Sequence, residues 1–198
     1  MGSLPRNHEH MPLIIETPRL QLVAYEPKHL LALMESNQRF KASFGLPPAE
    51  GLGAFLQSSD VSPDWVARVR ASTRGDPWLH GFAVVDRESR SVVGGLGFKG
   101  PPNDQGEVEI AYGVVPSFQN RGYATEATEA GVEFAFRHEA VMRVIAHTKT
   151  ENAASTRVLE KCGFAKIGDV IDPEDGLVWR WERQRRVAEP RTHETTKT

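Results

Sequence analysis

The chain has 198 residues, of which 39% are hydrophobic and 25% are charged, and its formal net charge at pH 7 is −2. This balance is typical of a globular domain, and it argues against a disordered chain and against nucleic acid as a partner. No apolar run is long enough to span a membrane or to form the core of a signal peptide, so we expect a cytoplasmic protein with no membrane partner.

The first hundred residues are predicted to contain both strands and helices. Residues 1–12 are expected to be a flexible leader. Apolar and polar residues mix at about period two around Leu20–Val23, and Glu26-Pro27 is typical of a helix start. In chain order, the predicted elements are a strand at 13–25, a helix from 27, a loop with a short helix at 45–64, a helix at 65–72, and a strand hairpin at 82–85 and 91–98.

The second half is predicted to contain a strand-helix-strand unit. Apolar residues occupy every second position of 107–114 and glutamates occupy the opposite face, which indicates a half-buried strand. The elements predicted after it are a loop at 116–122, helices at 124–138 and 152–162, strands at 143–148, 164–170 and 177–182, and a flexible tail at 184–198. The unit at 107–148 implies a parallel strand pair. The predicted fold is one α/β domain over 13–183, with a mixed sheet and helices on both faces.

The segment from Gln119 to Thr125 joins a predicted strand to the N-terminus of a helix. The first N–H groups of a helix make no intrahelical bonds and carry about half a positive charge, which suits a phosphate group. Gly122 lets an anion approach the backbone, Arg121 adds a full charge, and Ala124 is small. The spacing therefore predicts phosphate binding.

Two other phosphate-binding patterns are disfavoured. The Gly-x-x-x-x-Gly-Lys-Ser/Thr pattern is absent from the sequence, which argues against a P-loop nucleotide-binding protein. Gly95, Gly97 and Gly100 form a literal Gly-x-Gly-x-x-Gly, but two prolines and a turn follow where the dinucleotide-binding motif needs a helix. We interpret these glycines as part of a hairpin strand.

The segment Gln119-Asn120-Arg121-Gly122-Tyr123-Ala124 resembles the coenzyme A pyrophosphate loop of the GNAT N-acetyltransferase superfamily, Gln/Arg-x-x-Gly-x-Gly/Ala. Residues 109–112 resemble the central strand of that family, and residues 17–22 and 151–164 resemble segments of its RimJ/RimL-like branch. The likeness covers about 13–182, but it is absent at 40–75, a region that often shapes the acceptor site. It implies a GNAT-like fold, with a mostly antiparallel mixed sheet and a splayed parallel strand pair.

The resemblance also implies acetyl-CoA as cosubstrate and assigns its contacts. The strand ending at Val114 would bind pantetheine through its backbone, and the Val114 N–H would polarise the thioester carbonyl. The implied coenzyme contacts are Val114, Gln119, Asn120, Arg121, Gly122, Tyr123, Ala124, Thr125 and Asn152. Asn152 also suits the N-cap of a helix, and the two roles are compatible.

Two side chains match residues proposed to move protons in RimL-like members. Glu109 matches the general base, which takes a proton from the acceptor ammonium through water, and Glu107 on the same strand face is the alternative. Ser155 matches the general acid toward the coenzyme A thiolate, although it also suits helix capping. Cys162 lies nearest to the position of the tyrosine acid of many GNAT enzymes, and we interpret it as a core residue.

The implied reaction is direct attack of a primary amine on the thioester, through a tetrahedral intermediate. The amine belongs to a protein N-terminus, an amino acid or a small molecule, and the resemblance does not choose among them. No metal is expected, because the histidines have no metal-ligand spacing. A monomer and a homodimer both remain open. The alternative function is a non-catalytic acyl-CoA-binding or sensor module, against which Glu109 and Ser155 argue.

Overall fold

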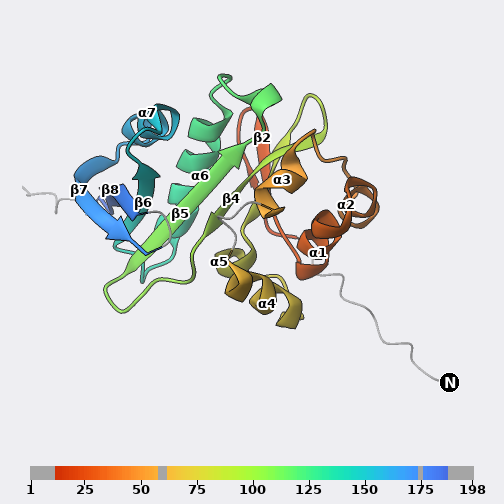
Figure 1. Cartoon of the computed structure of the whole chain (residues 1–198), viewed down its shortest axis with the longest axis horizontal. Helices are drawn as coiled ribbons and strands as arrows, with labels where there is room; N and C mark the ends of the chain where they lie inside the picture. The colour runs from red at the N-terminus through yellow and green to blue at the C-terminus, as the bar shows by residue number, and fades with distance from the viewer. Residues whose placement is uncertain (1–11, 58–61, 174–175, 187–198) are drawn as a thin grey trace, which may run out of the picture.

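The computed structural model describes residues 12–57, 62–173 and 176–186, so nearly all of the predicted leader and most of the predicted tail lie outside it. The strands are β1 (Ile14–Glu16), β2 (Leu20–Ala24), β3 (Phe82–Asp86), β4 (Ser91–Phe98), β5 (Glu107–Val114), β6 (Arg143–Lys149), β7 (Ala165–Asp172) and β8 (Gly176–Gln184). The helices are α1 (Pro27–Glu35), α2 (Asn37–Phe44), α3 (Leu52–Gln57), α4 (Pro63–Ala71), α5 (Pro77–His80), α6 (Tyr123–Arg137) and α7 (Ala153–Lys161) (Figure 1).

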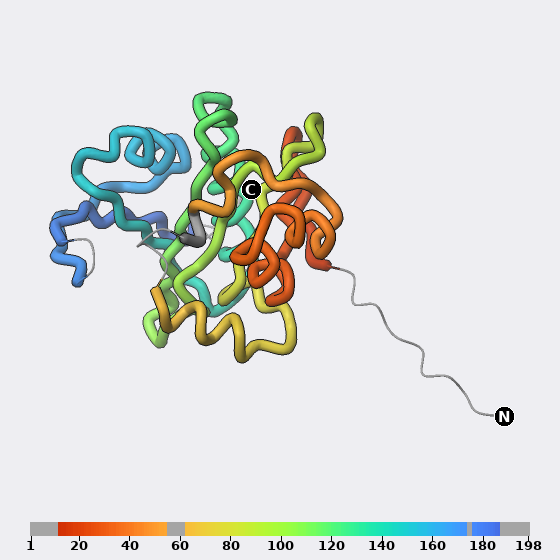
Figure 2. Tube along the Cα trace, turned by 45° about the vertical axis from the view of Figure 1, so that its right-hand side comes forward, coloured from red at the N-terminus to blue at the C-terminus, as the bar shows by residue number. Residues whose placement is uncertain are grey.

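The strands form one sheet in the order β1-β2-β3-β4-β5-β6-β8-β7. Every neighbouring pair is antiparallel except β5 and β6, which are parallel. The N-terminal strands and the C-terminal hairpin lie at opposite sides of the molecule, in red and blue in Figure 2. The predicted mixed sheet with a parallel pair at 107–148 is confirmed. None of the helices in the described ranges is both long and apolar enough to cross a membrane.

Helices cover both faces of the sheet, with α6 behind it and α3 in front of it in Figure 1. Helix α6 packs closely because Gly131 faces the sheet: a Cβ added there would lie 2.8 Å from both terminal methyl carbons of Leu96. Most of the residues that α6 buries are small, including Ala127, Ala130 and Ala135, as this close approach requires. Among the largest fully buried side chains are Phe40 of α2 and Phe82 of β3, so the core includes helices from the first quarter of the chain.

The structure differs from the sequence-based prediction at four places. The single strand predicted at 13–25 is two strands, because the chain turns at Thr17-Pro18-Arg19 and the Thr17 N–H bonds the Leu20 carbonyl at 3.0 Å. Helices α2 and α5 were not predicted. Helix α2 begins after Ser36, an N-cap whose hydroxyl accepts the Arg39 N–H at 3.2 Å. The helix has few apolar residues, so it shows no clear apolar stripe in the sequence. Strand β8 continues to Gln184, beyond the predicted domain end at 183.

Gly95 and Gly97 lie in β4, as the sequence interpretation required, whereas Gly100 lies two residues beyond the end of the strand. The added Cβ at Gly94 would overlap the Gly113 carbonyl oxygen and lie 3.1 Å from the Val114 Cα. Strand β5 can therefore approach β4 closely only because position 94 has no side chain. The next glycine, Gly95, is not constrained in this way, since its added Cβ would meet the Phe82 carbonyl oxygen at an ordinary 3.8 Å.

We expect Gly94→Ala to lower the free energy of unfolding by about 2–3 kcal/mol, because the new methyl group would push β5 away from β4. Gly95→Ala is the matched control on the same strand and should change it by less than about 0.5 kcal/mol. Urea denaturation followed by circular dichroism measures both. Equal stability of the two variants would show that the approach at position 94 is not a tight constraint.

Candidate active site

Strands β5 and β6 begin side by side and then separate. Their paired positions are Glu107 with Arg143, Val108 with Val144, and Glu109 with Ile145. Strand β5 continues five residues beyond the last pair and β6 continues four. The parallel pair is therefore open at its C-terminal end, and backbone groups of both strands face the gap.

The Val114 backbone points into this gap. The Lys99 N–H donates to the Glu109 carbonyl at 3.0 Å, and the Val115 N–H donates to the Val93 carbonyl at 2.9 Å, so Glu109 and Val115 face β4. Backbone groups alternate sides along a strand. The Val114 N–H and carbonyl thus face away from β4. The Gln119 side-chain amide donates to that carbonyl at 2.9 Å and holds the end of the strand in place.

The loop after β5 turns sharply into α6. Asn120 has φ +59° and Gly122 has φ +79°, both in the left-handed region. Gly122 is the N-cap of α6, and the Glu126 N–H closes the first turn on the Gly122 carbonyl at 3.0 Å. The N–H groups before Glu126 therefore precede the helical ladder, and an alternation of backbone conformations of this kind forms a concave anion-binding nest.

A cavity of about 400 Å³ lies between the end of β5, this loop and α7. Its volume falls in the range of small-molecule sites. It is lined by Tyr112, Gly113, Val114, Phe118, Gln119, Asn120, Gly122, Tyr123, Ala124, Thr125, Asn152, Ala154, Ser155, Arg157, Val158 and Lys161. The structure therefore brings together every residue predicted to contact coenzyme A except Arg121, together with the predicted acid Ser155.

Arg121 does not line the cavity. Its guanidinium lies over the Phe118 ring, 4.7 Å from the centroid, and donates to the Ser117 carbonyl at 3.1 Å. The cavity has two other cations, Arg157 and Lys161 of α7, which were not among the predicted site residues. Because they lie four residues apart, both side chains are on the same face of α7, the face that lines the cavity.

Helix α7 forms the wall opposite the loop. The Asn152 side chain accepts the Ser155 N–H at 3.0 Å, so the predicted N-cap is confirmed. Tyr112 reaches the same wall, and its hydroxyl donates to the Ser155 carbonyl at 3.3 Å. Tyr112 was predicted only as a half-buried strand residue. Burial raises the pKa of its phenol well above the ordinary value, so the hydroxyl stays protonated at neutral pH.

Cys162 is a core residue, as predicted. Its side chain is buried at the end of α7, and its Sγ lies 3.5 Å from the Thr125 carbonyl oxygen. Burial raises the pKa of the thiol to about 11. Because only the thiolate is a strong nucleophile, Cys162 is poorly suited to a covalent step.

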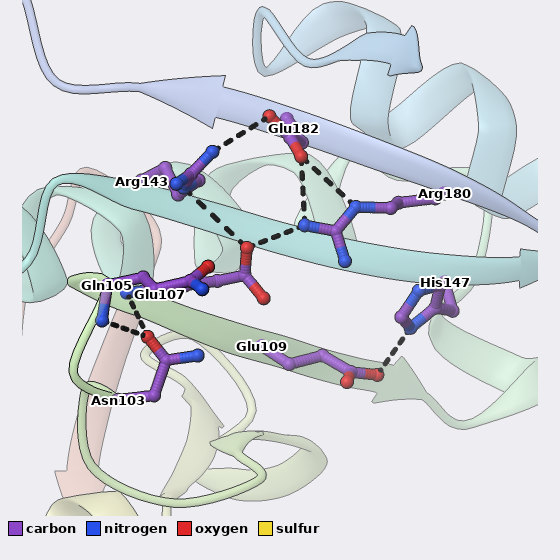
Figure 3. A network of polar contacts seen from close by, with 8 residues as sticks. All are labelled: Asn103, Gln105, Glu107, Glu109, Arg143, His147, Arg180 and Glu182. Atoms are coloured by element: carbon purple, nitrogen blue, oxygen red, sulfur yellow. Dashed lines mark hydrogen bonds and ion pairs between the residues drawn. The ribbon is translucent and has the colours of Figure 1, made fainter. Parts of the chain in front are cut away.

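The two glutamates of β5 project from the same strand but bind different partners (Figure 3). Glu107 is 2.6 Å from Arg180 Nη2 and 3.6 Å from Arg143 Nε. Glu109 lies 3.0 Å from His147 Nδ1 and 2.7 Å from Lys99 Nζ. Glu107 is thus held between two arginines, whereas Glu109 is held between a lysine and an imidazole.

Neither glutamate lines the cavity. His147, which the sequence did not single out, contacts Glu109. It lies two residues beyond Ile145, the last residue of β6 that pairs with β5, and so it stands where β6 flanks the gap. Its side chain shares the sheet face of Glu109. A carboxylate only accepts hydrogen bonds, so His147 Nδ1 is the donor in this pair.

Comparison with known proteins identifies the family. A family model described as an acetyltransferase (GNAT) domain matches residues 19–165. Uncharacterized N-acetyltransferase YoaA of Bacillus subtilis (strain 168) is 27% identical over 158 residues, which cover 78% of this chain and 84% of that protein. Uncharacterized N-acetyltransferase YjdG of the same organism is 34% identical over 93 residues, 46% of this chain and 53% of that protein. The chain thus matches about half the length of YjdG.

A solved structure has the same fold. It is RimL, a ribosomal L7/L12 alpha-N-protein acetyltransferase in complex with coenzyme A, and it matches with a TM-score of 0.62 at 18% identity. The match covers 87% of this chain and 98% of that chain. The family model spans β2, the loop at the N-terminus of α6 and all of α7. The chain belongs to the GNAT acetyltransferase family.

Proposed function

We propose that this chain is an acetyl-CoA-dependent N-acetyltransferase that moves an acetyl group to a primary amine. The observation that carries the proposal is the gap between β5 and β6, which opens beside the N-terminus of α6. The pantetheine arm is extended and contains amide groups. These amides can form hydrogen bonds with the backbone groups of strands that face the gap. A diphosphate matches the helix N-terminus and the two cations of α7.

The Val114 N–H is proposed to stabilise the oxygen of the thioester carbonyl as it gains charge. The amine nitrogen attacks the carbonyl carbon, the carbon–sulfur bond breaks, and the sulfur leaves as a thiolate. One backbone donor of this kind contributes a few kcal/mol to rate in other enzymes. Ser155, which lines the cavity, is the proposed proton donor to the thiolate, although a thiolate of ordinary pKa ~8.5 also leaves without help.

Glu109 and His147 are the proposed acceptors of the amine proton. An alkylammonium with a pKa of ~10 is mostly protonated at neutral pH and cannot attack until it loses that proton. Glu109 and His147 are 3.0 Å apart, and His147 flanks the gap on the sheet face that it shares with Glu109. We propose that the proton passes through water to this pair, with Glu109 supplying the negative charge that stabilises it.

The acceptor is proposed to be a protein N-terminus, an amino acid or a small-molecule amine. RimL carries the name of an enzyme that acts on a protein N-terminus, so peptides with free N-termini come first among the acceptors to test. Its 18% identity supports a common fold and no common acceptor, so amino acids and polyamines belong in the same panel.

We expect coenzyme A and acetyl-CoA, but neither ATP nor NADH, to raise the melting temperature. A ligand at 100 times its Kd stabilises the native state by about 2.7 kcal/mol, or roughly 5–10 °C for a chain of this size. Differential scanning fluorimetry measures this shift, and thiol release from acetyl-CoA against the amine panel measures turnover. A shift without thiol release on any amine would favour the non-catalytic acyl-CoA-binding module. The absence of a shift would refute the coenzyme site.

Glu109→Gln should lower kcat/KM for the acceptor by about 10²–10⁴-fold, the usual contribution of a general base. The loss should shrink as the pH approaches 10, because the free amine then forms without help. Glu107→Gln is the matched control: it removes a charge from the same strand face, and within the described residues Glu107 pairs with Arg180 and Arg143 while His147 pairs with Glu109. The opposite order of losses in the two variants would assign the base to Glu107.

A further inference from the structure

Glu126 is a negative charge close to the place where a diphosphate is proposed to bind. It lies in the first turn of α6, and its side chain is only 14% exposed. An unpaired carboxylate there would repel a second anion. Its two oxygens are instead occupied: Oε2 accepts from Arg19 Nε at 2.7 Å, and Oε1 accepts from the Thr17 hydroxyl at 2.6 Å and the Arg19 N–H at 2.8 Å.

These contacts keep Glu126 ionised and paired. Burial by itself would raise the pKa of this carboxyl group, but the hydrogen bonds from Thr17 and Arg19 and the charge of Arg19 outweigh it and hold the pKa below its ordinary value. The charge that α6 carries at its first turn is therefore neutralised by a residue more than one hundred positions earlier in the chain.

Arg19 also holds the loop itself. Its Nη1 donates to the Arg121 carbonyl at 2.7 Å, and its guanidinium carbon lies 4.9 Å from the centroid of the Tyr123 ring. A Cβ added to Gly122 would lie 3.2 Å from Arg19 Nη2. The guanidinium therefore lies against three consecutive residues of the loop, yet Arg19 is not among the residues that line the cavity.

The bond to the Arg121 carbonyl sets the direction of the next N–H. The Arg121 carbonyl and the Gly122 N–H belong to one planar trans peptide and point in opposite directions. With the carbonyl oxygen turned toward Arg19, the Gly122 N–H points away from Arg19, and Gly122 lines the cavity. The same bond keeps a partly negative oxygen away from the site of an incoming anion.

We propose that Arg19 and Glu126 are positioning residues for the diphosphate of acetyl-CoA. They fix the loop with its N–H donors toward the cavity before the ligand arrives, and neither of them contacts the ligand. Donors that are already in place bind a ligand more tightly, because the loop loses little conformational entropy on binding. The inference rests on the proposed function, since it assumes that the cavity takes coenzyme A.

Arg19→Gln is expected to raise the Kd for coenzyme A about tenfold or more, which corresponds to the loss of a charge-assisted hydrogen bond. Isothermal titration calorimetry with coenzyme A measures this without knowledge of the acceptor. For any amine on which the wild type releases thiol, KM for acetyl-CoA should rise by a similar factor while kcat at saturation stays within about twofold. A general structural defect would lower kcat as well.

Arg87→Gln is the matched control. Arg87 is as exposed as Arg19, at 49%, and bonds the Thr17 carbonyl at 3.0 Å, but it does not touch the loop in any contact of the described residues. This variant should bind coenzyme A like the wild type. Arg19→Lys keeps the charge but not the planar fork that reaches both partners, so its Kd should also rise.

The variants are expected to fold, because the loop has a second tether, from the Tyr123 hydroxyl to Asp86 Oδ1 at 3.0 Å. Melting temperatures without ligand check this. If the wild type binds coenzyme A and both Arg19 variants bind it equally well, or if kcat falls while KM does not rise, the positioning role is wrong. If the wild type does not bind coenzyme A, the proposed function itself fails.

Discussion

The opening of the parallel strand pair is the constraint on which the rest of the site depends. A sheet satisfies its backbone donors and acceptors by pairing strands, and a pair that stops after Glu109 and Ile145 leaves groups on both strands that need other partners. Strand β5 keeps its course because β4 holds it from the other side, at the distance that Gly94 permits. The gap is thus a fixed feature of the sheet, and the loop, α6 and α7 are arranged around its mouth.

The sheet separates two kinds of chemistry. On the side of α6 and α7 lies a cavity with helix N–H groups and two cations, suited to a long anionic ligand. On the face of Glu107 and Glu109 lies a network of carboxylates, arginines and one imidazole, suited to proton transfer (Figure 3). The end of β5 belongs to both, because the Val114 backbone faces the gap between them. In the proposed reaction, the acyl donor would lie on the first side of the sheet and the amine would reach its carbonyl carbon from the second.

Local patterns in the sequence predicted most of this fold. The alternation in 107–114, the Gly122 and Ala124 positions of the loop, and the cap at Asn152 each depend on neighbours a few positions away. Each can therefore be predicted directly from the sequence. The pairing of His147 with Glu109 depends on which residues of β5 and β6 lie opposite each other, a register that no local pattern contains. In the sequence, Arg19 and Glu126 are two charged residues far apart that have no sign of being partners. Their contact follows only from the packing of β2 against α6.

The burial of Cys162 has a consequence for the fate of the product. The proposed reaction releases a free thiol into a cavity whose wall, α7, ends at the only cysteine of the chain. That cysteine is enclosed by the core and protonated, so it is a poor partner for disulfide exchange. We therefore expect no disulfide between Cys162 and the released coenzyme A in the native protein. The same burial should make Cys162 slow to react with thiol-detecting reagents, so the colour that develops in the proposed reaction would report the thiol of coenzyme A.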